Sequence, residues 1–261
     1  MNMEDLIKIY DVTKNIVRIE LTNGKKHNPL SLELMKSLTY SLKEISSRSN
    51  VRVLIISSEG PGFSAGHDLE ELKRNKNNKE FFKTLFNECS HLMQTIMGLT
   101  QPVIAEVCGI AAAAGCQLVA SCDLAVASEQ AAFMTPGVNI GLFCSTPMVA
   151  VSRNISRKKM MEMLLTGEKL SAKEAVDFGL VNHCVSFDKL ENKTLALADL
   201  IASKPRSTVT IGKEAFYKQL EMPVVEAYNY TSEVMAMNML ELDAQEGINA
   251  FLEKRVPSWN K

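Results

Sequence analysis

Phe63-Ser-Ala-Gly-His-Asp-Leu69 and Gly109-Ile-Ala-Ala-Ala-Ala-Gly-Cys-Gln-Leu-Val-Ala-Ser-Cys-Asp123 are the two stretches of sequence that decide the fold. In each, an apolar run typical of a buried strand leads into a turn of very small residues, and a helix start follows. Small residues let main-chain N–H groups approach a ligand without obstruction, and helix N-termini favour negative charge. The pattern therefore predicts two backbone donors for a carbonyl oxygen, which together form an oxyanion hole.

The composition is that of an ordinary globular protein and excludes several function classes. The 261 residues are 46% hydrophobic and 23% charged, enough for one large domain or a domain with a helical appendage. The net charge of −1 arises from 29 basic and 30 acidic residues without long blocks, which argues against a nucleic-acid partner. No apolar run reaches the roughly 18 residues of a membrane span, so we expect no membrane partner.

The cysteines and the N-terminus bear on the cellular compartment. The six cysteines include no C-x-x-C pair, and five lie in apolar or small-residue stretches typical of buried reduced thiols, so we expect no zinc or other metal. Residues 1–7 show neither a secretory signal nor a transit peptide, which predicts a cytoplasmic protein. A mitochondrial matrix location stays open if a transit peptide has been removed.

The first half of the chain predicts alternating strands and helices. Residues 6–21 alternate as a hairpin, Ser31 can cap a helix, and the continuous apolar run 51–56 is typical of a central strand, which makes a β–α–β crossover. The polar stretch 73–79 predicts a loop or mobile lid ahead of an amphipathic helix over 82–96.

Further α/β units and a helical tail complete the predicted organisation. The units are a strand over 102–107, a helix over 112–122, a strand over 123–127, a helix near 156–165 and a strand over 179–185. We predict an α/β spiral core over residues 1–187 and a helical region over 188–261. The tail is too long and apolar to stay solvated, so it must cover the core or a neighbouring subunit.

Six segments together resemble the enoyl-CoA hydratase/isomerase (crotonase) family over residues 6–260. They are Asn28-Pro-Leu-Ser31, Phe63–Leu69, Pro102-Val-Ile-Ala-Glu-Val-Cys-Gly109, Gly115–Asp123, Thr166–Val181 and Phe251-Leu-Glu-Lys-Arg255. The resemblance implies a crotonase-like spiral of ββα units with a C-terminal trimerisation region, and a homotrimer or dimer of trimers. It also implies a lyase or isomerase of fatty acid and lipid metabolism. Such a protein acts on an acyl-CoA or enoyl-CoA thioester, with coenzyme A as part of the substrate and no permanently bound cofactor.

The resemblance assigns the site, and two positions depart from the family pattern. The oxyanion donors are the N–H groups of His67 and Ala114. The places of the two family glutamates hold Gln117 and Gly137. Glutamine orients water but cannot accept its proton at neutral pH, and glycine offers no side chain, so the two-carboxylate mechanism is excluded.

Other residues are assigned to substrate binding by the same resemblance. Lys25 and Lys26 correspond to groups near the CoA adenine and phosphates, and Lys254 to a lysine that reaches a neighbour's CoA; each could equally be a solvated surface lysine. The acyl chain would pass Gln117, Gly137 and Phe143. The remaining positions are Ala65, Gly66, Asp68, Leu69, Gly115 and Phe251.

Several side chains have both a structural and a chemical interpretation. His67 could move protons or point away while its N–H binds substrate, and Asp68 could serve as a helix N-cap. Cys144-Ser145-Thr146 could form a nucleophilic turn, or Ser145 or Thr146 could cap the next helix. A buried charge-assisted hydrogen bond at Asp123 is the alternative to catalysis there.

Two functional hypotheses from different classes follow. The first is a lyase or isomerase that uses water held by Gln117 and an unconventional group such as His67 or Asp68. The second is a non-catalytic acyl-CoA binding protein with a regulatory or sequestering role. A serine peptidase or thioesterase is disfavoured because Ser145 has no histidine partner in its motif.

Overall fold

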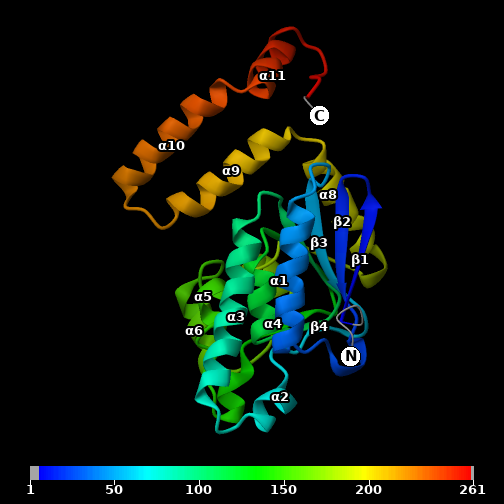
Figure 1. Ribbon diagram of the computed structural model, residues 1–261, viewed down its shortest axis with the longest axis vertical. Coiled ribbons are helices and arrows are strands. Elements are labelled where there is room, and N and C mark those ends of the chain that lie inside the picture. The colour runs from blue at the N-terminus through cyan, green and yellow to red at the C-terminus, as the bar shows by residue number, and fades with distance from the viewer. Residues whose placement is uncertain (1–5, 260–261) are drawn as a thin grey trace.

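The computed structural model describes residues 6–259, and a six-stranded sheet forms the centre of the body (Figure 1). Its first two strands form the predicted antiparallel hairpin, and every later neighbour in the sheet runs parallel, as β–α–β crossovers require. In spatial order the strands are β1 (Ile7–Thr13), β2 (Ile16–Leu21), β3 (Val53–Ser58), β5 (Val103–Val107), β7 (Leu124–Ser128) and β10 (His183–Val185). The strand predicted over 179–185 is therefore shorter than expected.

A second sheet of four very short strands lies beside the first and was not predicted. β6 lies between β4 and β8 in parallel, and β8 pairs antiparallel with β9. The strands are β4 (Gly62–Ser64), β6 (Ile110–Ala112), β8 (Ala132–Met134) and β9 (Leu170–Ser171). Because β4 and β6 are neighbours and each runs straight into one of the two small-residue turns, this sheet brings those turns together.

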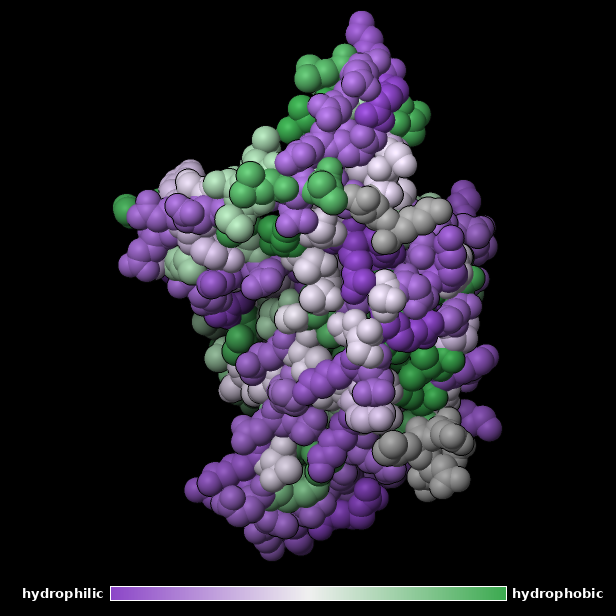
Figure 2. Space-filling model, turned by 45° about the horizontal axis from the view of Figure 1, so that its top comes forward, coloured by the Kyte–Doolittle hydropathy of each residue, from purple (hydrophilic) through white to green (hydrophobic). Residues whose placement is uncertain are grey.

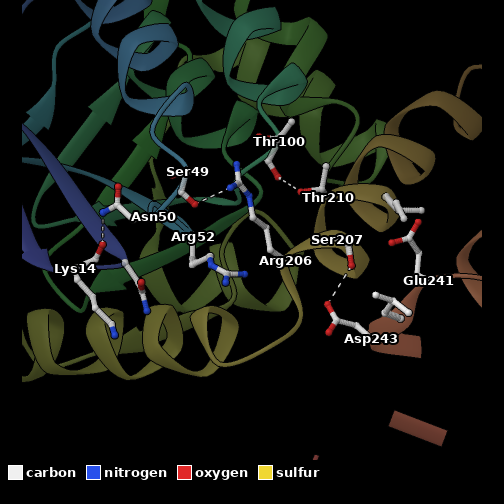
Figure 3. Close-up of a pocket in the computed structure, with 13 residues that line it drawn as sticks. Lys14, Ser49, Asn50, Arg52, Thr100, Arg206, Ser207, Thr210, Glu241 and Asp243 are labelled. Atoms are coloured by element: carbon white, nitrogen blue, oxygen red, sulfur yellow. Dashed lines mark hydrogen bonds between the residues drawn. The ribbon is translucent and has the colours of Figure 1, made fainter. Parts of the chain in front are cut away.

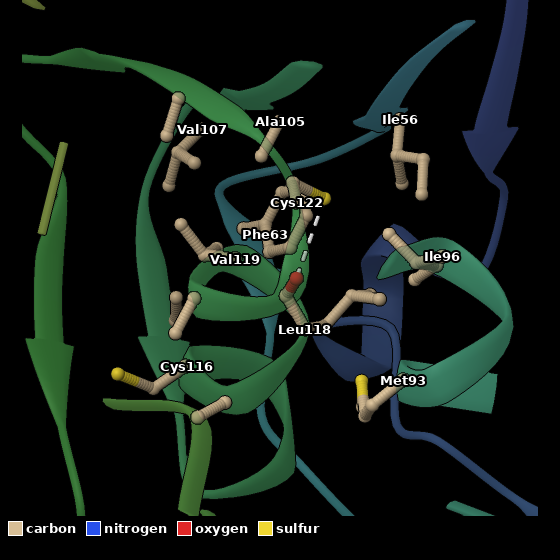
Figure 4. Packing of buried hydrophobic residues seen from close by; sticks show 14 of the residues in the cluster. Ile56, Phe63, Met93, Ile96, Ala105, Val107, Cys116, Leu118, Val119 and Cys122 are labelled. Carbon is tan, nitrogen blue, oxygen red and sulfur yellow. Dashed lines mark hydrogen bonds between the residues drawn. The ribbon is translucent and has the colours of Figure 1, made fainter. Parts of the chain in front are cut away.

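Helices cover both faces of the central sheet. On one face lie α1 (Leu32–Ser46), α3 (Lys79–Gly98) and α4 (Ala114–Ser121), whose apolar sides share one core with the sheet (Figure 4). On the other face, α8 (Leu190–Ala202) packs on β3, β5 and β7. The domain boundary that we expected after residue 187 therefore falls just before a helix that belongs to the body.

The remaining elements of the body are short. They are α2 (Leu69–Arg74), α5 (Pro147–Val151), α6 (Arg157–Thr166), α7 (Ala172–Asp177) and the 3₁₀ turns η2 (Gly24–Lys26), η3 (Pro136–Ile140) and η4 (Phe187–Lys189). The loop predicted over 73–79 was wrong in extent. Lys73 and Arg74 end α2, Lys79 begins α3, and only four residues connect the two helices. The loop is shorter than predicted because Asp68 is the N-cap of α2 and Asn78 is the N-cap of α3, so helices form on both sides of it.

Three C-terminal helices project from the body: α9 (Arg206–Gln219), α10 (Val224–Met239) and α11 (Leu242–Leu252) (Figure 1). Many of their apolar side chains face outward, and hydrophobic groups stand among polar ones on the projecting part of the surface (Figure 2). Examples are Val225, Tyr228, Met235, Met237, Phe251 and Leu252. Within one chain, α10 and α11 do not cover the core, so a neighbouring subunit remains the expected cover. None of the helices in residues 6–259 is long and apolar enough to cross a membrane.

Candidate functional site

The two small-residue turns touch each other, and glycine is required where they meet. Gly66 has a φ of +86°, and a Cβ there would lie 2.8 Å from the Ala112 carbonyl oxygen and 3.2 Å from the Ala114 nitrogen. A Cβ on Gly115 would lie 2.4 Å from the Ser64 carbonyl oxygen. A side chain at either position would collide with the opposite turn. Only glycine therefore allows the main chains of the two turns to lie side by side.

The main-chain N–H groups of His67 and Ala114, which are the expected oxyanion donors, lie next to this contact. Ala114 is the first residue of α4, and the residue before it, Ala113, has φ 49° and ψ −115°, a conformation that non-glycine residues rarely adopt. Within residues 6–259, neither N–H donates a hydrogen bond to the main chain. Backbone donors without a partner are unusual, and backbone strain concentrates at functional sites. We call this pair of N–H groups the clamp.

Asn28 and Ser64 support the clamp from behind, a role that the sequence alone did not reveal. The Ser64 hydroxyl donates to the Asn28 carbonyl oxygen (2.8 Å) and accepts from the Gly66 N–H (3.2 Å). The Asn28 amide donates to the carbonyl oxygens of Glu59 and Gly62, both at 3.0 Å. Asn28 is fully buried with a φ of 50°. Neither property can be read from the sequence, in which Asn28 is only the first residue of the motif Asn28-Pro-Leu-Ser31.

The side chains of His67 and Asp68 are engaged away from the clamp. The imidazole Nδ1 lies 3.4 Å from the Leu30 carbonyl oxygen, and the ring packs edge-on against Phe86 with centroids 5.3 Å apart. Its Nε2 is buried without a partner, and burial lowers the pKa of His67. The Asp68 carboxylate accepts from the N–H groups of Glu70 and Glu71, which confirms the predicted N-cap. Asp68 therefore has a structural role, whereas the His67 ring is held on one side by Leu30 and Phe86 and leaves Nε2 without a partner.

The two positions that hold glutamate in the family pattern are both enclosed. Gln117 is 4% exposed, and its Oε1 lies 3.6 Å from the Cys89 thiol. It lines a cavity of about 400 Å³ bounded by α3, α4, α5 and α9. A Cβ on Gly137 would lie 2.8 Å from the Leu142 carbonyl oxygen and 2.9 Å from the Cys144 sulfur. The space beside Gly137 is thus already filled, and a larger residue there requires the backbone to move.

The other expected binding residues divide between the two ends of the chain. Lys25 and Lys26 lie in η2, and Lys26 pairs with Glu70 of the short α2 at 3.2 Å, so these residues lie near Ala65, Asp68 and Leu69. Phe143 follows η3 and is half exposed. Phe251 and Lys254 lie on and after α11, at the opposite end of the molecule (Figure 1). One chain alone does not bring those two residues to the clamp.

Asp123 forms a buried network, as its structural interpretation predicts. Its carboxylate accepts from the Val103 N–H and the Lys213 ammonium, both at 2.7 Å, and from the Tyr217 hydroxyl at 2.9 Å. Burial lowers the pKa of Lys213, whereas burial and the nearby Asp123 charge raise the pKa of Tyr217. Lys213 and Tyr217 were not identified from the sequence. The network attaches α9 to the end of α4.

The remaining sequence candidates are the turn Cys144–Thr146 and the cysteines. Thr146 occupies the N-cap position of α5, but its side chain makes no capping bond, and Ser145 does not supply one either, so that prediction was wrong. All six cysteines are free thiols, and burial raises the pKa of Cys89 and of Cys116 to about 12. No group of His, Cys, Asp or Glu side chains within the described residues could hold a metal ion.

The family model described as enoyl-CoA hydratase/isomerase matches residues 11–261. The chain belongs to the enoyl-CoA hydratase/isomerase family. It is 49% identical over 250 residues to human enoyl-CoA hydratase domain-containing protein 3, mitochondrial, a match that covers 96% of this chain and 81% of that protein. The match confirms the family assigned from the six sequence segments.

Solved structures of the enoyl-CoA hydratase/isomerase family confirm the α/β crotonase fold with its helical C-terminal region. An enoyl-CoA hydratase from Mycobacterium smegmatis superposes with a TM-score of 0.95 at 42% identity, covering 98% of this chain and 99% of that one. Human enoyl-CoA hydratase domain-containing protein 3 superposes with a TM-score of 0.94 at 47% identity, covering 97% and 100% of the two chains. The projecting helices are therefore part of the family fold.

Proposed function

We propose that this chain binds acyl-CoA and enoyl-CoA thioesters at the clamp and hydrates enoyl-CoA slowly, with Gln117 orienting the water. One observation carries the proposal. Two N–H groups, on His67 and Ala114, have no main-chain partner within the described residues, at the place where Gly66 fits against Ala112–Ala114 and Gly115 fits against Ser64. A thioester carbonyl that becomes an enolate during reaction is the kind of group that such donors stabilise.

The energetics support binding more strongly than turnover. One oxyanion donor typically contributes about 2.7–4 kcal/mol to transition-state stabilisation, so two donors can hold an enolate. Positioned acid–base groups typically contribute another factor of roughly 10²–10⁴. Gln117 cannot supply that factor, and the side chains of His67 and Asp68 are engaged elsewhere. We therefore expect slow hydration at best.

The surroundings of the clamp suit the rest of a CoA thioester. The cavity beside Gln117 has apolar walls that include Met93, Val149 and Phe216, and its volume of about 400 Å³ lies within the usual range of ligand pockets. We assign it to the acyl chain. Lys25 and Lys26, exposed near the first turn, are suited to the CoA phosphates.

The second candidate function is non-catalytic binding of acyl-CoA, for regulation or sequestration. The observation that favours it is the filled space beside Gly137, where Cys144 and the Leu142 carbonyl oxygen occupy the volume that a side chain would need. Because this space is filled, a substitution of Gly137 alone would not place a carboxylate there. On this hypothesis the clamp binds thioesters without turnover.

A panel of acyl-CoA and enoyl-CoA thioesters, scored for both thermal shift and turnover, tests the two functions together. Stabilisation by thioesters with slow hydration of short enoyl-CoAs supports the first function, and stabilisation without any hydration supports the second. Free CoA is the control, because it lacks the carbonyl. Equal stabilisation by free CoA and thioesters would contradict the clamp, and so would no stabilisation by either.

We further propose a homotrimer or a dimer of trimers in which Phe251 and Lys254 reach the site of a neighbouring subunit. The apolar side chains exposed on α10 and α11 and the distance of these two residues from their own clamp support it. Sedimentation of the purified protein tests the assembly. The relatives are named mitochondrial, so cell fractionation is needed to choose between matrix and cytoplasm. Residues 1–5, on which the cytoplasmic prediction largely rests, lie outside the described residues.

A further inference from the structure

A cavity of about 960 Å³ lies between the body and the C-terminal helices, away from the clamp (Figure 3). The turn between β1 and β2 forms one wall and the segment just before β3 another. The starts of α9 and α11 complete it. Polar and charged side chains from all these segments line it.

Charged side chains of both signs line this cavity, with the basic ones in excess. Lys14, Arg52 and Arg206 line it, and Lys204 lines a small pocket that adjoins the same two arginines. None of these four cations forms an ion pair within residues 6–259. The wall also carries Glu241 and Asp243, and Asp243 accepts a hydrogen bond from Ser207 at 3.4 Å. The cations therefore outnumber the acidic groups.

The two arginines in this cavity have donor capacity that an anion could satisfy. Nη1 of Arg52 is buried without a hydrogen-bond partner, and a buried donor of this kind costs free energy unless water or an ion accepts from it. Arg206 donates from Nη1 to the Ser49 carbonyl oxygen at 2.6 Å, which fixes its guanidinium in the same cavity (Figure 3). Two guanidinium groups held in one cavity repel each other unless an anion lies between them.

Two helix N-termini add further positive potential to this cavity. α9 begins at Arg206 and α11 at Leu242, and neither has a side-chain cap. The first N–H groups of a helix carry partial positive charge and bind phosphate readily. The hydroxyls of Ser207 and Thr210 line the same wall, but each already donates within the chain, to Asp243 and to the Thr100 carbonyl oxygen, both at 3.4 Å.

We propose that this cavity binds a small molecule that carries a phosphate group, with Arg52 and Arg206 as its anchors. Guanidinium groups match phosphate oxygens in a bidentate geometry, and the cavity volume is at the upper end of the usual range for ligand pockets. The site is separate from the clamp and does not depend on the proposed function.

Titration calorimetry of the full chain with ATP, and separately with inorganic phosphate, tests this site at constant ionic strength. We expect both probes to bind, ATP more tightly. Arg52→Gln and Arg206→Gln should each weaken ATP binding at least tenfold, the usual effect of losing a charge-assisted hydrogen bond. Arg48→Gln is the matched control, because Arg48 lies four residues from Arg52 but pairs with Asp11 at 2.6 Å. It should change the affinity less than twofold.

Three results would overturn the proposal. The first is no binding of either probe, which would also follow if a second copy of the chain filled the cavity. The second is equal weakening by Arg48→Gln, which indicates general charge attraction. The third is loss of binding only in Lys25→Gln or Lys26→Gln, which would place the phosphate near the clamp. Lys14→Gln, on an exposed turn, provides a variant whose folding is not in question.

Discussion

Replacing Gly66 with alanine should damage both the fold and the clamp, and the two costs can be separated. An L-residue at φ +86° costs roughly 1–2 kcal/mol in left-handed strain. The new methyl would also lie 2.8 Å from the Ala112 carbonyl oxygen, a backbone atom that cannot turn aside. Overpacking of this kind typically costs about 1–3 kcal/mol more. The free energy of unfolding should therefore fall by about 2–5 kcal/mol.

Gly141→Ala is the matched control for this experiment. Gly141 has a similar φ of +77°, but a Cβ there meets nothing within 4 Å. It therefore carries the left-handed strain without the contact, and both variants gain equally from reduced freedom in the unfolded chain. Urea unfolding of the two variants should differ by about 1–3 kcal/mol, which isolates the collision between the turns.

Thioester binding then decides whether the contact positions the clamp. In Gly66→Ala the methyl pushes against Ala112–Ala114, so the Ala114 N–H is displaced and short enoyl-CoA should bind at least tenfold more weakly. Any hydration should fall by roughly 10²–10³, the usual effect of losing one donor. Gly141→Ala should bind normally. If the two variants were equally stable and bound thioester equally well, the glycine contact would not be what positions the donors.

Four further perturbations have defined outcomes. Gln117→Glu should raise the rate of enoyl-CoA hydration at least tenfold, because a carboxylate can accept the proton of the water, and an unchanged rate would show that water is not held there. Tyr217→Phe should make unfolding less sensitive to alkali: the folded pKa of Tyr217 lies above its unfolded value of 10.0, so wild-type stability is lost as pH rises above about 10, as urea titrations at pH 9 and 11 would show. His67→Gln should leave the pH profile of any hydration unchanged. Because burial lowers the folded pKa of His67 below 6.5, the same variant should flatten the loss of stability below pH 6.5, and a lost rate instead would make the ring catalytic. Phe251→Asp should dissociate the assembly in sedimentation experiments, since the side chain is 83% exposed in one chain and a carboxylate does not pack in an apolar interface; an unchanged sedimentation coefficient would contradict a role for α11 in assembly.

The parts of the structure that were predictable from sequence are those set by local chemistry. Apolar runs indicated the hairpin and the β–α–β crossover, and Asp68 and Ser31 cap helices as their residue types suggest. The second sheet could not be predicted, because strands of two or three residues have no readable period.

Contacts between distant residues account for most of what was missed in the site. In the sequence, Lys213 has the pattern of a surface lysine on an amphipathic helix. Only the fold brings it into contact with Asp123, which lies 90 residues away in sequence. The filled space beside Gly137 is also a contact that the sequence does not show. The turn after η3 brings Cys144 next to Gly137. The family resemblance predicts that a carboxylate is missing at Gly137, but it did not indicate that the space beside this residue is filled.

The clamp and the proton-transfer groups are physically independent in this fold. The proposed donors are backbone N–H groups that lie beside Gly66 (φ +86°) and Ala113 (φ 49°), whereas the family resemblance places the acid–base groups at positions 117 on α4 and 137 on η3. A change at position 117 or 137 can therefore remove acid–base chemistry without moving either donor. On the proposed function, a chain of the enoyl-CoA hydratase/isomerase family could therefore keep the two N–H groups in place with Gln117 and Gly137 at the positions where the family resemblance implies glutamates. This independence also requires that mutations of the turns weaken binding and turnover together, while mutations at Gln117 change turnover alone.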